Sequence, residues 1–182
     1  MPGVAIALDV SISMARAYGD LSPSKLDAAV EAIAAVSRRL VEARRRVGLV
    51  LFAGWALPLI YPVSDAKLIL RSLRYVNRTY EGSAPGDAIV EGVRMLRPLQ
   101  ARDRRIVLVT DGEYNMGVPL EHAIVYALNS GMRLDMVVIG GLEGARLAEV
   151  GRQFGESIHW WPVKSKGELY QALLKSTGAA GE

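Results

Sequence analysis

Oxygen-bearing side chains lie where two short apolar segments end and in a glycine-rich loop that precedes a helix. They include carboxylates and hydroxyls, and the chain has no cysteine to add a sulfur ligand. Oxygen ligands of this kind suit Mg²⁺ or Mn²⁺ rather than zinc. In an open parallel sheet, such groups meet at the carboxyl ends of the strands. These side chains come from Asp9, Ser11 and Ser13, from Thr110, Asp111 and Glu113, and from the loop 79–87, which supplies another hydroxyl.

Alternating apolar and helical segments predict the elements that position these side chains. Apolar runs of strand length alternate with longer segments of helical period, which is typical of a parallel sheet wrapped by helices. The second and third runs are too close for a helical crossover, so the third strand is expected to be an antiparallel partner at the sheet edge. The predicted strands are 4–10, 47–53, 56–61, 105–110, 134–139 and 157–161, and the predicted helices are 26–44, 65–75, 87–99, 119–129, 143–154 and 165–176.

Length and composition agree with one folded domain. The chain has 182 residues, of which 51% are hydrophobic and 23% charged, so it is too short for a second full domain and too apolar for a disordered chain. The expected fold class is α/β, with a doubly wound, Rossmann-like sheet of six mostly parallel strands in the order 3-2-1-4-5-6. Strand three is antiparallel at the edge, and helices cover both faces. The domain is expected to span 1–177, with 178–182 as a frayed tail.

One uncharged stretch, 47–64, is long enough to be compared with a membrane span. A spanning helix needs about 20 apolar residues, whereas this stretch contains two glycines and two prolines and divides into two short β-like runs. We therefore interpret it as a hairpin. The first residues lead directly into a predicted core strand with no basic segment before it, so no signal peptide is expected. The expected location is the cytoplasm.

Three short motifs occur in the same order as in a known family. They are Asp-x-Ser-x-Ser beginning at Asp9, Gly-Ser ending at Ser83, and Thr-Asp-Gly beginning at Thr110. With these motifs and their placement after strands, the chain resembles the von Willebrand factor A domain with its metal-ion-dependent adhesion site, over essentially its whole length. Two positions depart from the family pattern: Ser83 stands in place of a threonine, and Ile12 stands in place of a frequent glycine.

The resemblance implies both a site and a function. The hydroxyls of Ser11, Ser13 and Ser83 would bind Mg²⁺ or Mn²⁺, and Asp9 and Asp111 would hold the ion directly or through water. In this family a partner's carboxylate fills the open coordination position, so the resemblance implies a metal-dependent protein–protein interaction module rather than an enzyme. The segments 82–89 and 106–115 look like intracellular prokaryotic members, many of which work beside MoxR-type AAA+ ATPases in complex maturation. The expected partner is therefore an acidic residue of another protein, with such an ATPase as a candidate.

Two other functions fit parts of the sequence. One is a Mg²⁺-dependent phosphohydrolase with Asp9 as nucleophile, but such a site normally has a second carboxylate two residues later, where this chain has Ser11. The other is a metal-independent scaffold that binds nucleic acid through a basic face. Arginines of the segments 38–46 and 102–105 are expected at the end of the sheet opposite the candidate ligands, where we interpret them mainly as complements to helix dipoles. The net charge of +3 is low for a nucleic-acid-binding chain.

The remaining polar residues near the candidate ligands are interpreted as structural. Asp87 and Glu113 are expected to be carboxylates at helix starts rather than metal ligands. Neither His122 nor His159 forms a recognisable pair with an acid, and the chain lacks the Gly-x-Ser-x-Gly pattern of a nucleophile elbow. The sequence therefore favours a binding site over a catalytic one.

Overall fold

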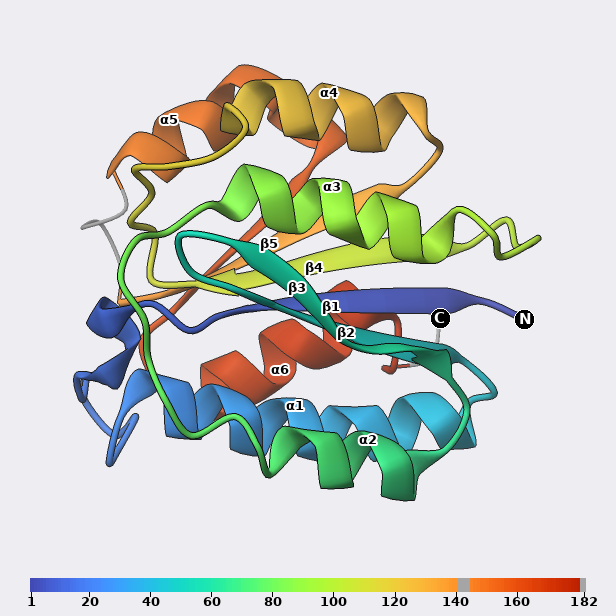
Figure 1. Ribbon diagram of the computed structural model, residues 1–182, viewed down its shortest axis with the longest axis horizontal. Coiled ribbons are helices and arrows are strands. Elements are labelled where there is room, and N and C mark those ends of the chain that lie inside the picture. The colour runs from blue at the N-terminus through green and yellow to red at the C-terminus, as the bar shows by residue number, and fades with distance from the viewer. Residues whose placement is uncertain (141–144, 181–182) are drawn as a thin grey trace.

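A six-stranded sheet forms the middle layer of the molecule, between two layers of helices (Figure 1). The computed structural model describes residues 1–140 and 145–180, without the side chains of residues 145, 146 and 148. The strand order is β3-β2-β1-β4-β5-β6, in which β3 pairs antiparallel with β2 and the other neighbouring strands pair in parallel. The predicted fold class, strand order and antiparallel edge are confirmed. The strands are β1 (Gly3–Asp9), β2 (Arg46–Phe52), β3 (Ala56–Val63), β4 (Arg104–Thr110), β5 (Arg133–Ile139) and β6 (His159–Val163).

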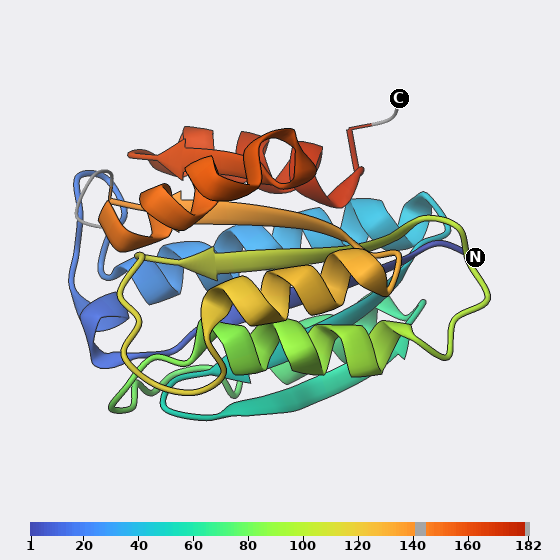
Figure 2. The same cartoon turned by 90° about the horizontal axis from the view of Figure 1, so that it is seen from above.

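Helices α1, α2 and α6 lie on one face of the sheet, and α3, α4 and α5 lie on the other (Figures 1 and 2). Side-chain caps set where α1, α2 and α6 begin, because Ser24, Asp65 and Ser165 each accept a hydrogen bond from a backbone amide in the first turn. The helices are α1 (Lys25–Glu42), α2 (Ala66–Leu73), α3 (Pro85–Leu96), α4 (Leu120–Asn129), α5 (Ala145–Phe154) and α6 (Lys166–Thr177), with 3₁₀ helices η1 (Ile12–Ala15) and η3 (Gly155–Ser157).

The central strands contribute side chains to two hydrophobic cores, one on each face of the sheet. In β1, Ile6 and Leu8 pack with α1, α2 and α6, whereas Ala5 and Ala7 pack with α3, α4 and α5. Strands β4 and β5 alternate in the same way. Burial on both faces explains why these strands are continuous apolar runs in the sequence. Each large apolar side chain buried here contributes roughly 1.5–3 kcal/mol to folding.

Both edge strands extend further than predicted. Strand β3 continues past Pro62, and β6 continues past Pro162. Helix η3 occupies the predicted start of the last strand. Proline is tolerated in an edge strand because its missing N–H can face away from the sheet. Each strand therefore includes a proline that lies just beyond its predicted end.

The ends of α3 also differ from the prediction. The helix begins at Pro85 rather than at residue 87 and ends at Leu96 rather than at residue 99. Proline suits the first turn because its missing N–H has no partner within the helix, and Pro98 stops the helix soon after Leu96. The predicted start of the fifth helix at residue 143 lies outside the described residues. The ends of α1, α2, α4 and α6 lie within two residues of their predicted positions.

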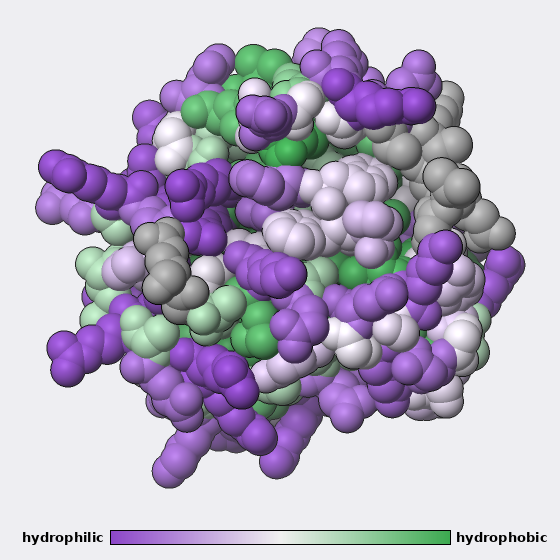
Figure 3. Space-filling model, turned by 180° about the vertical axis from the view of Figure 1, so that it is seen from behind, coloured by the Kyte–Doolittle hydropathy of each residue, from purple (hydrophilic) through white to green (hydrophobic). Residues whose placement is uncertain are grey.

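The uncharged stretch 47–64 forms most of the β2–β3 hairpin, as its glycines and prolines indicated. Within the described ranges, no helix is long and apolar enough to cross a membrane. Seen from behind, the surface is a mixture of hydrophilic areas and smaller hydrophobic ones (Figure 3).

The chain leaves α6 through Gly178, which has the left-handed φ of 73°. The amides of Gly178 and Ala179 donate hydrogen bonds to the carbonyls of Lys175 and Leu174. These bonds cap the last helix, as is common for a glycine at this position. The expected domain boundary at 177 stays a prediction, and residues 181 and 182 lie outside the described ranges.

Candidate metal centre

Three loops meet at the end of the sheet where the neighbouring strands β1 and β4 end (Figure 1). One loop follows β1 and contains η1, the second precedes α3, and the third follows β4. A pocket of about 130 Å³ lies among them. Its lining includes the predicted ligands Ser11, Ser13 and Ser83, together with the exposed side chains of Glu81 and Glu113.

Asp9 is the last residue of β1 and is fully buried. Its Oδ1 accepts a hydrogen bond of 2.8 Å from the amide of Ser11, and its Oδ2 accepts one of 2.6 Å from the hydroxyl of Thr110. Burial raises the pKa of Asp9 to about 7, although the hydrogen bonds from Ser11 and Thr110 act in the opposite direction. Asp9 therefore joins the first loop to the end of β4, and neither Asp9 nor Asp111 is among the described residues that line the pocket.

The loop after β1 presents two hydroxyls side by side. The Oγ atoms of Ser11 and Ser13 are 3.0 Å apart. Between them, the amide of Ile12 donates a hydrogen bond of 2.9 Å to the carbonyl of Tyr80, which ties this loop to the segment before α3. The side chain of Met14 is fully buried and anchors η1 in the core. The loop is thus held from both sides with its hydroxyls at the pocket.

Ser83 is buried at the start of α3, and its Oγ has no hydrogen-bond partner. The amide of Ser83 donates to Oδ1 of Asn115, and the amide of Asn115 donates to the carbonyl of Ser83, both at 3.0 Å. Gly82 has a φ of 79°, which favours glycine. A Cβ at Gly86 would lie 2.0 Å from the carbonyl oxygen of Val118. The two glycines therefore allow the loop before α3 to approach the loop after β4.

Asp111 is buried directly after β4 and divides its two oxygens between different surroundings. Its Oδ2 accepts a hydrogen bond of 2.6 Å from Nζ of Lys25, the first residue of α1. Its Oδ1 is buried and has no hydrogen-bond partner. The negative charge of Asp111 also adds to the effect of burial on the pKa of Asp9.

Two of the predicted ligands thus present buried oxygens that make no hydrogen bond, Ser83 Oγ and Asp111 Oδ1. Buried polar atoms are normally paired, because an unpaired one costs about 1–3 kcal/mol. Within the described residues, no group of three or more His, Cys, Asp or Glu side chains is placed to hold a metal. The candidate donor set is therefore the mixed one of carboxylates and hydroxyls, and its unpaired oxygens fit a hard cation such as Mg²⁺ that keeps several waters.

The sequence pattern of the von Willebrand factor type A domain matches residues 4–113, more than half of the chain. The chain belongs to the von Willebrand factor type A domain family. The expected resemblance is confirmed at this level. The metal-ion-dependent adhesion site and the prokaryotic intracellular type stay predictions.

Solved structures share the fold of this A domain. The conserved hypothetical protein BatB from Bacteroides thetaiotaomicron has a TM-score of 0.80 at 23% identity, over 98% of this chain and 100% of that one. An aerotolerance-related membrane protein from Bacteroides fragilis NCTC 9343 has a TM-score of 0.77 at 25% identity, over 98% and 99%. The PilB minor pilin from Streptococcus sanguinis has a TM-score of 0.77 at 15% identity, over 98% of this chain and 60% of that one. No curated protein matches the chain.

Two residues that contact the predicted ligands were not identified from the sequence, Lys25 and Asn115. Lys25 reaches Asp111 because its own amide is fixed by a hydrogen bond of 2.9 Å to the carbonyl of Arg16. The one available signal was its position, since the first turn of a helix favours acidic residues over a lysine. Asn115 gave no comparable signal, because its role depends on how two loops of the A domain approach each other.

Two carboxylates near the site, Asp87 and Glu113, were expected at helix starts, and only Asp87 lies at one. Asp87 does lie in the first turn of α3, where its Oδ1 also accepts a hydrogen bond of 2.9 Å from the amide of Val118. Glu113 does not lie at a helix start, because α4 begins only at Leu120. It is exposed in the loop after β4 and lines the pocket. The predicted helix start at residue 119 is close to the observed one, so Glu113 belongs to the middle of the loop rather than to a helix start.

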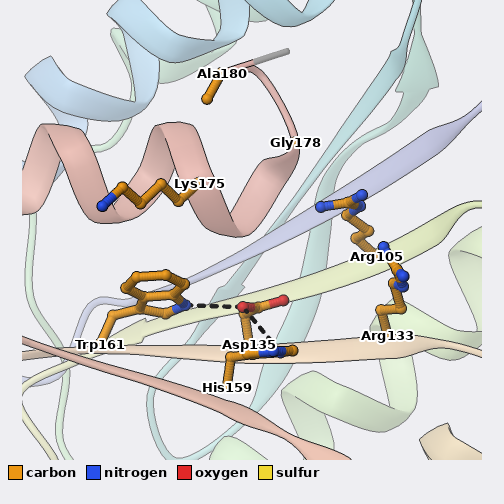
Figure 4. Close-up of a pocket in the computed structure, with 8 residues that line it drawn as sticks. All are labelled: Arg105, Arg133, Asp135, His159, Trp161, Lys175, Gly178 and Ala180. Carbon is orange, nitrogen blue, oxygen red and sulfur yellow. Dashed lines mark hydrogen bonds and ion pairs between the residues drawn. The ribbon is translucent and has the colours of Figure 1, made fainter. Parts of the chain in front are cut away.

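A larger cavity of about 360 Å³ lies at the opposite end of the sheet, lined by basic residues of β4, β5 and α6 (Figure 4). There, Nε1 of Trp161 donates a hydrogen bond of 2.8 Å to Oδ1 of Asp135, and Nδ1 of His159 lies 3.8 Å from the same oxygen. The expectation that His159 has no acidic partner is therefore wrong. Among the described residues, the side chains that line this cavity include no serine, threonine or tyrosine hydroxyl.

Arginines gather at this same end of the A domain, opposite the candidate metal ligands, as predicted. Arg45 and Arg105 both bind the carboxylate of Asp103, at 2.6 Å and 2.8 Å. Burial raises the pKa of Asp103, but the hydrogen bonds from Arg105 and Arg45 outweigh it and hold the pKa below its ordinary value. Part of the basic charge is therefore compensated within the chain.

Proposed function

We propose that this A domain is a metal-dependent protein-binding module. A Mg²⁺ or Mn²⁺ ion would be held by the hydroxyls of Ser11, Ser13 and Ser83 and by Asp111, while Asp9 holds the loops after β1 and β4 in place through its hydrogen bonds. When bound, the ion supplies a positive charge that a partner's carboxylate can contact. The observation that carries this proposal is the pair of buried oxygens without partners, Ser83 Oγ and Asp111 Oδ1, in loops that meet at one pocket.

Exposed apolar side chains on the loops of the site support a protein partner. Ile12, Tyr80 and Met116 are 49%, 43% and 53% exposed. The first two are joined by a backbone hydrogen bond, and the amide of Met116 donates to the carbonyl of Ser83 at 3.2 Å. Large apolar side chains gathered at a polar pocket are typical of an interaction surface. We infer that the partner's acidic residue is flanked by apolar ones.

The surroundings of Asp9 favour binding over phosphohydrolysis. Both of its oxygens accept short hydrogen bonds, and the side chain is fully buried. A nucleophile must reach the substrate with a free oxygen, which Asp9 does not present. For the same reason, a supporting role for Asp9 agrees better with its geometry than a catalytic one.

The proposed partner class is an AAA+ ATPase of the MoxR type, and the proposed location is the cytoplasm, where such a partner finds ATP. This proposal rests on the likeness of the segments 82–89 and 106–115 to intracellular prokaryotic A domains. The basic end of the sheet is not proposed as a nucleic-acid site, because Asp103 pairs with two of its arginines.

Thermal unfolding in EDTA, Mg²⁺ and Mn²⁺ tests the metal part of the proposal. An ion present at 100 times its Kd stabilises the folded state by about 2.7 kcal/mol. For a chain of this size, the expected rise in Tm is about 5–10 °C. The rise should be absent in Asp111→Asn and retained in Asp103→Asn, a matched change at the opposite end. Equal shifts in both variants would reject the site.

Binding to a peptide array tests the partner part. Each acidic peptide is paired with the same peptide carrying Asn or Gln, and the array is probed with the labelled domain in Mg²⁺ or in EDTA. We expect binding of acidic peptides with apolar neighbours, only in Mg²⁺, and lost in Ser83→Ala. Binding that does not depend on the acidic residue, or that is the same in Mg²⁺ and in EDTA, would reject the proposed function.

A further inference from the structure

The ammonium of Lys25 already occupies one side of the proposed metal site. Its Nζ lies 2.6 Å from Oδ2 of Asp111, and the two side chains are only 12% and 4% exposed. This is the ion pair by which the long helix α1 contacts the loop after β4. Because the pair is largely removed from water, its attraction is screened far less than that of a surface pair.

The position of Lys25 in its helix is unfavourable without this pair. Lys25 is the first residue of α1, next to the cap residue Ser24. The positive end of a helix dipole favours acidic residues and disfavours a lysine there. Asp111 supplies the compensating charge, and Lys25 compensates Asp111 in return. The domain can therefore bury the Asp111 carboxylate without any metal ion.

We propose that Lys25 is the resident counter-cation of Asp111 and that a divalent ion must compete with its ammonium for this carboxylate. The inference rests on the proposed function, because it concerns the same site. Only Oδ1 of Asp111 is without a partner, so the ion meets a carboxylate whose charge is already shared. Lys25 lowers the metal affinity of the site and makes metal occupancy depend on what a partner's carboxylate adds.

A titration of Mn²⁺, followed by the loss of the free-ion electron paramagnetic resonance signal, tests this. The proteins are the wild type, Lys25→Met and the control Lys67→Met, which removes the same charge from an exposed lysine of α2. We expect Lys25→Met to bind Mn²⁺ at least about tenfold more tightly than the wild type, since it removes a like charge from beside the ion. Lys67→Met should bind as the wild type does.

Two other outcomes separate a failure of this inference from a failure of the proposed function. If Lys25→Met binds with the same or lower affinity than the wild type, the inference is overturned while the proposed metal site stands. If none of the three proteins binds Mn²⁺ at millimolar concentration, the proposed function fails together with the inference.

A second variant covers the risk that Lys25→Met does not fold without metal. Lys25→Gln removes the charge and keeps a neutral hydrogen-bond donor on a side chain that is one atom shorter. Its Tm in EDTA should be lower than that of the wild type, and its rise in Tm on adding Mn²⁺ should be larger. A rise equal to that of the wild type would contradict the role assigned to Lys25.

Discussion

The hydroxyl of Thr110 donates a hydrogen bond of 2.6 Å to Oδ2 of Asp9, which joins the ends of the neighbouring strands β4 and β1. The same hydroxyl oxygen accepts a hydrogen bond of 3.1 Å from the amide of Gly112. Asp9 in turn accepts from the amide of Ser11. One buried network therefore fixes the two loops that carry the carboxylates of the site.

Removing the Thr110 hydroxyl should loosen this network. Thr110→Val keeps the shape of the side chain but leaves a buried carboxylate oxygen unpaired, which costs about 1–3 kcal/mol. We expect the free energy of unfolding in urea to fall by that amount. Thr110→Ser keeps the hydroxyl, so its free energy of unfolding should fall by less than half as much. Equal losses in the two variants would mean that the methyl group, rather than the hydrogen bond, matters here.

Removing the Ser83 hydroxyl should affect metal binding but not metal-free stability. Its Oγ is buried without a partner, so Ser83→Ala in EDTA should unfold at the same Tm or slightly higher. The rise in Tm on adding Mg²⁺ should shrink, because one ligand is gone. Ser37→Ala removes another buried hydroxyl without a partner, in α1. It is the matched control and should keep the full metal-induced rise.

Gly86 should not tolerate a side chain. A Cβ there would lie 2.0 Å from the backbone oxygen of Val118, so Gly86→Ala must displace the loop after β4. We expect a loss of about 1–3 kcal/mol in urea unfolding. Gly167→Ala in α6 is the control, because the nearest atom to its Cβ is 4.0 Å away. It should be neutral or stabilising by up to about 1 kcal/mol. If Gly86→Ala loses no more stability than Gly167→Ala, the chain accommodates a Cβ at Gly86 and the close approach to Val118 is not supported.

Stability in acid should depend on Asp103. The pKa of Asp103 is lower in the folded state than its ordinary value, so the unfolded chain takes up a proton first as the pH falls. The stabilisation from this group is present above its unfolded pKa of about 4 and is lost as the pH falls through the folded pKa. Asp103→Asn should therefore lower Tm at pH 6, and its difference from the wild type should shrink as the pH is lowered below about 4. A constant difference across this range would exclude a charge effect.

The sequence was sufficient for the sheet and for the parts of the site that follow strands directly. Asp9 and Asp111 each come immediately after a buried apolar run, and neighbouring parallel strands must bring such residues together. Where an edge strand ends was harder to predict, because Pro62 and Pro162 are compatible with both a strand and its end.

Contacts that depend on packing between distant segments could not be predicted. Lys25 and Asp111 are 86 residues apart, and their pairing depends on where the first turn of α1 meets the loop after β4. The same holds for the contact between Asn115 and Ser83. Local patterns report periodicity and turns, whereas these contacts follow from the positions of whole elements in the fold.

Anomalous diffraction at the manganese absorption edge would locate the metal ion that Ser11, Ser13, Ser83 and Asp111 are proposed to hold. Crystals of the domain grown in MnCl₂ should show an anomalous peak among the hydroxyls of Ser11, Ser13 and Ser83 and the carboxylate of Asp111. Crystals of Ser83→Ala should show that peak weakened or missing. A wild-type map without a peak in this pocket, or with one held by Glu81 and Glu113 alone, would contradict the account.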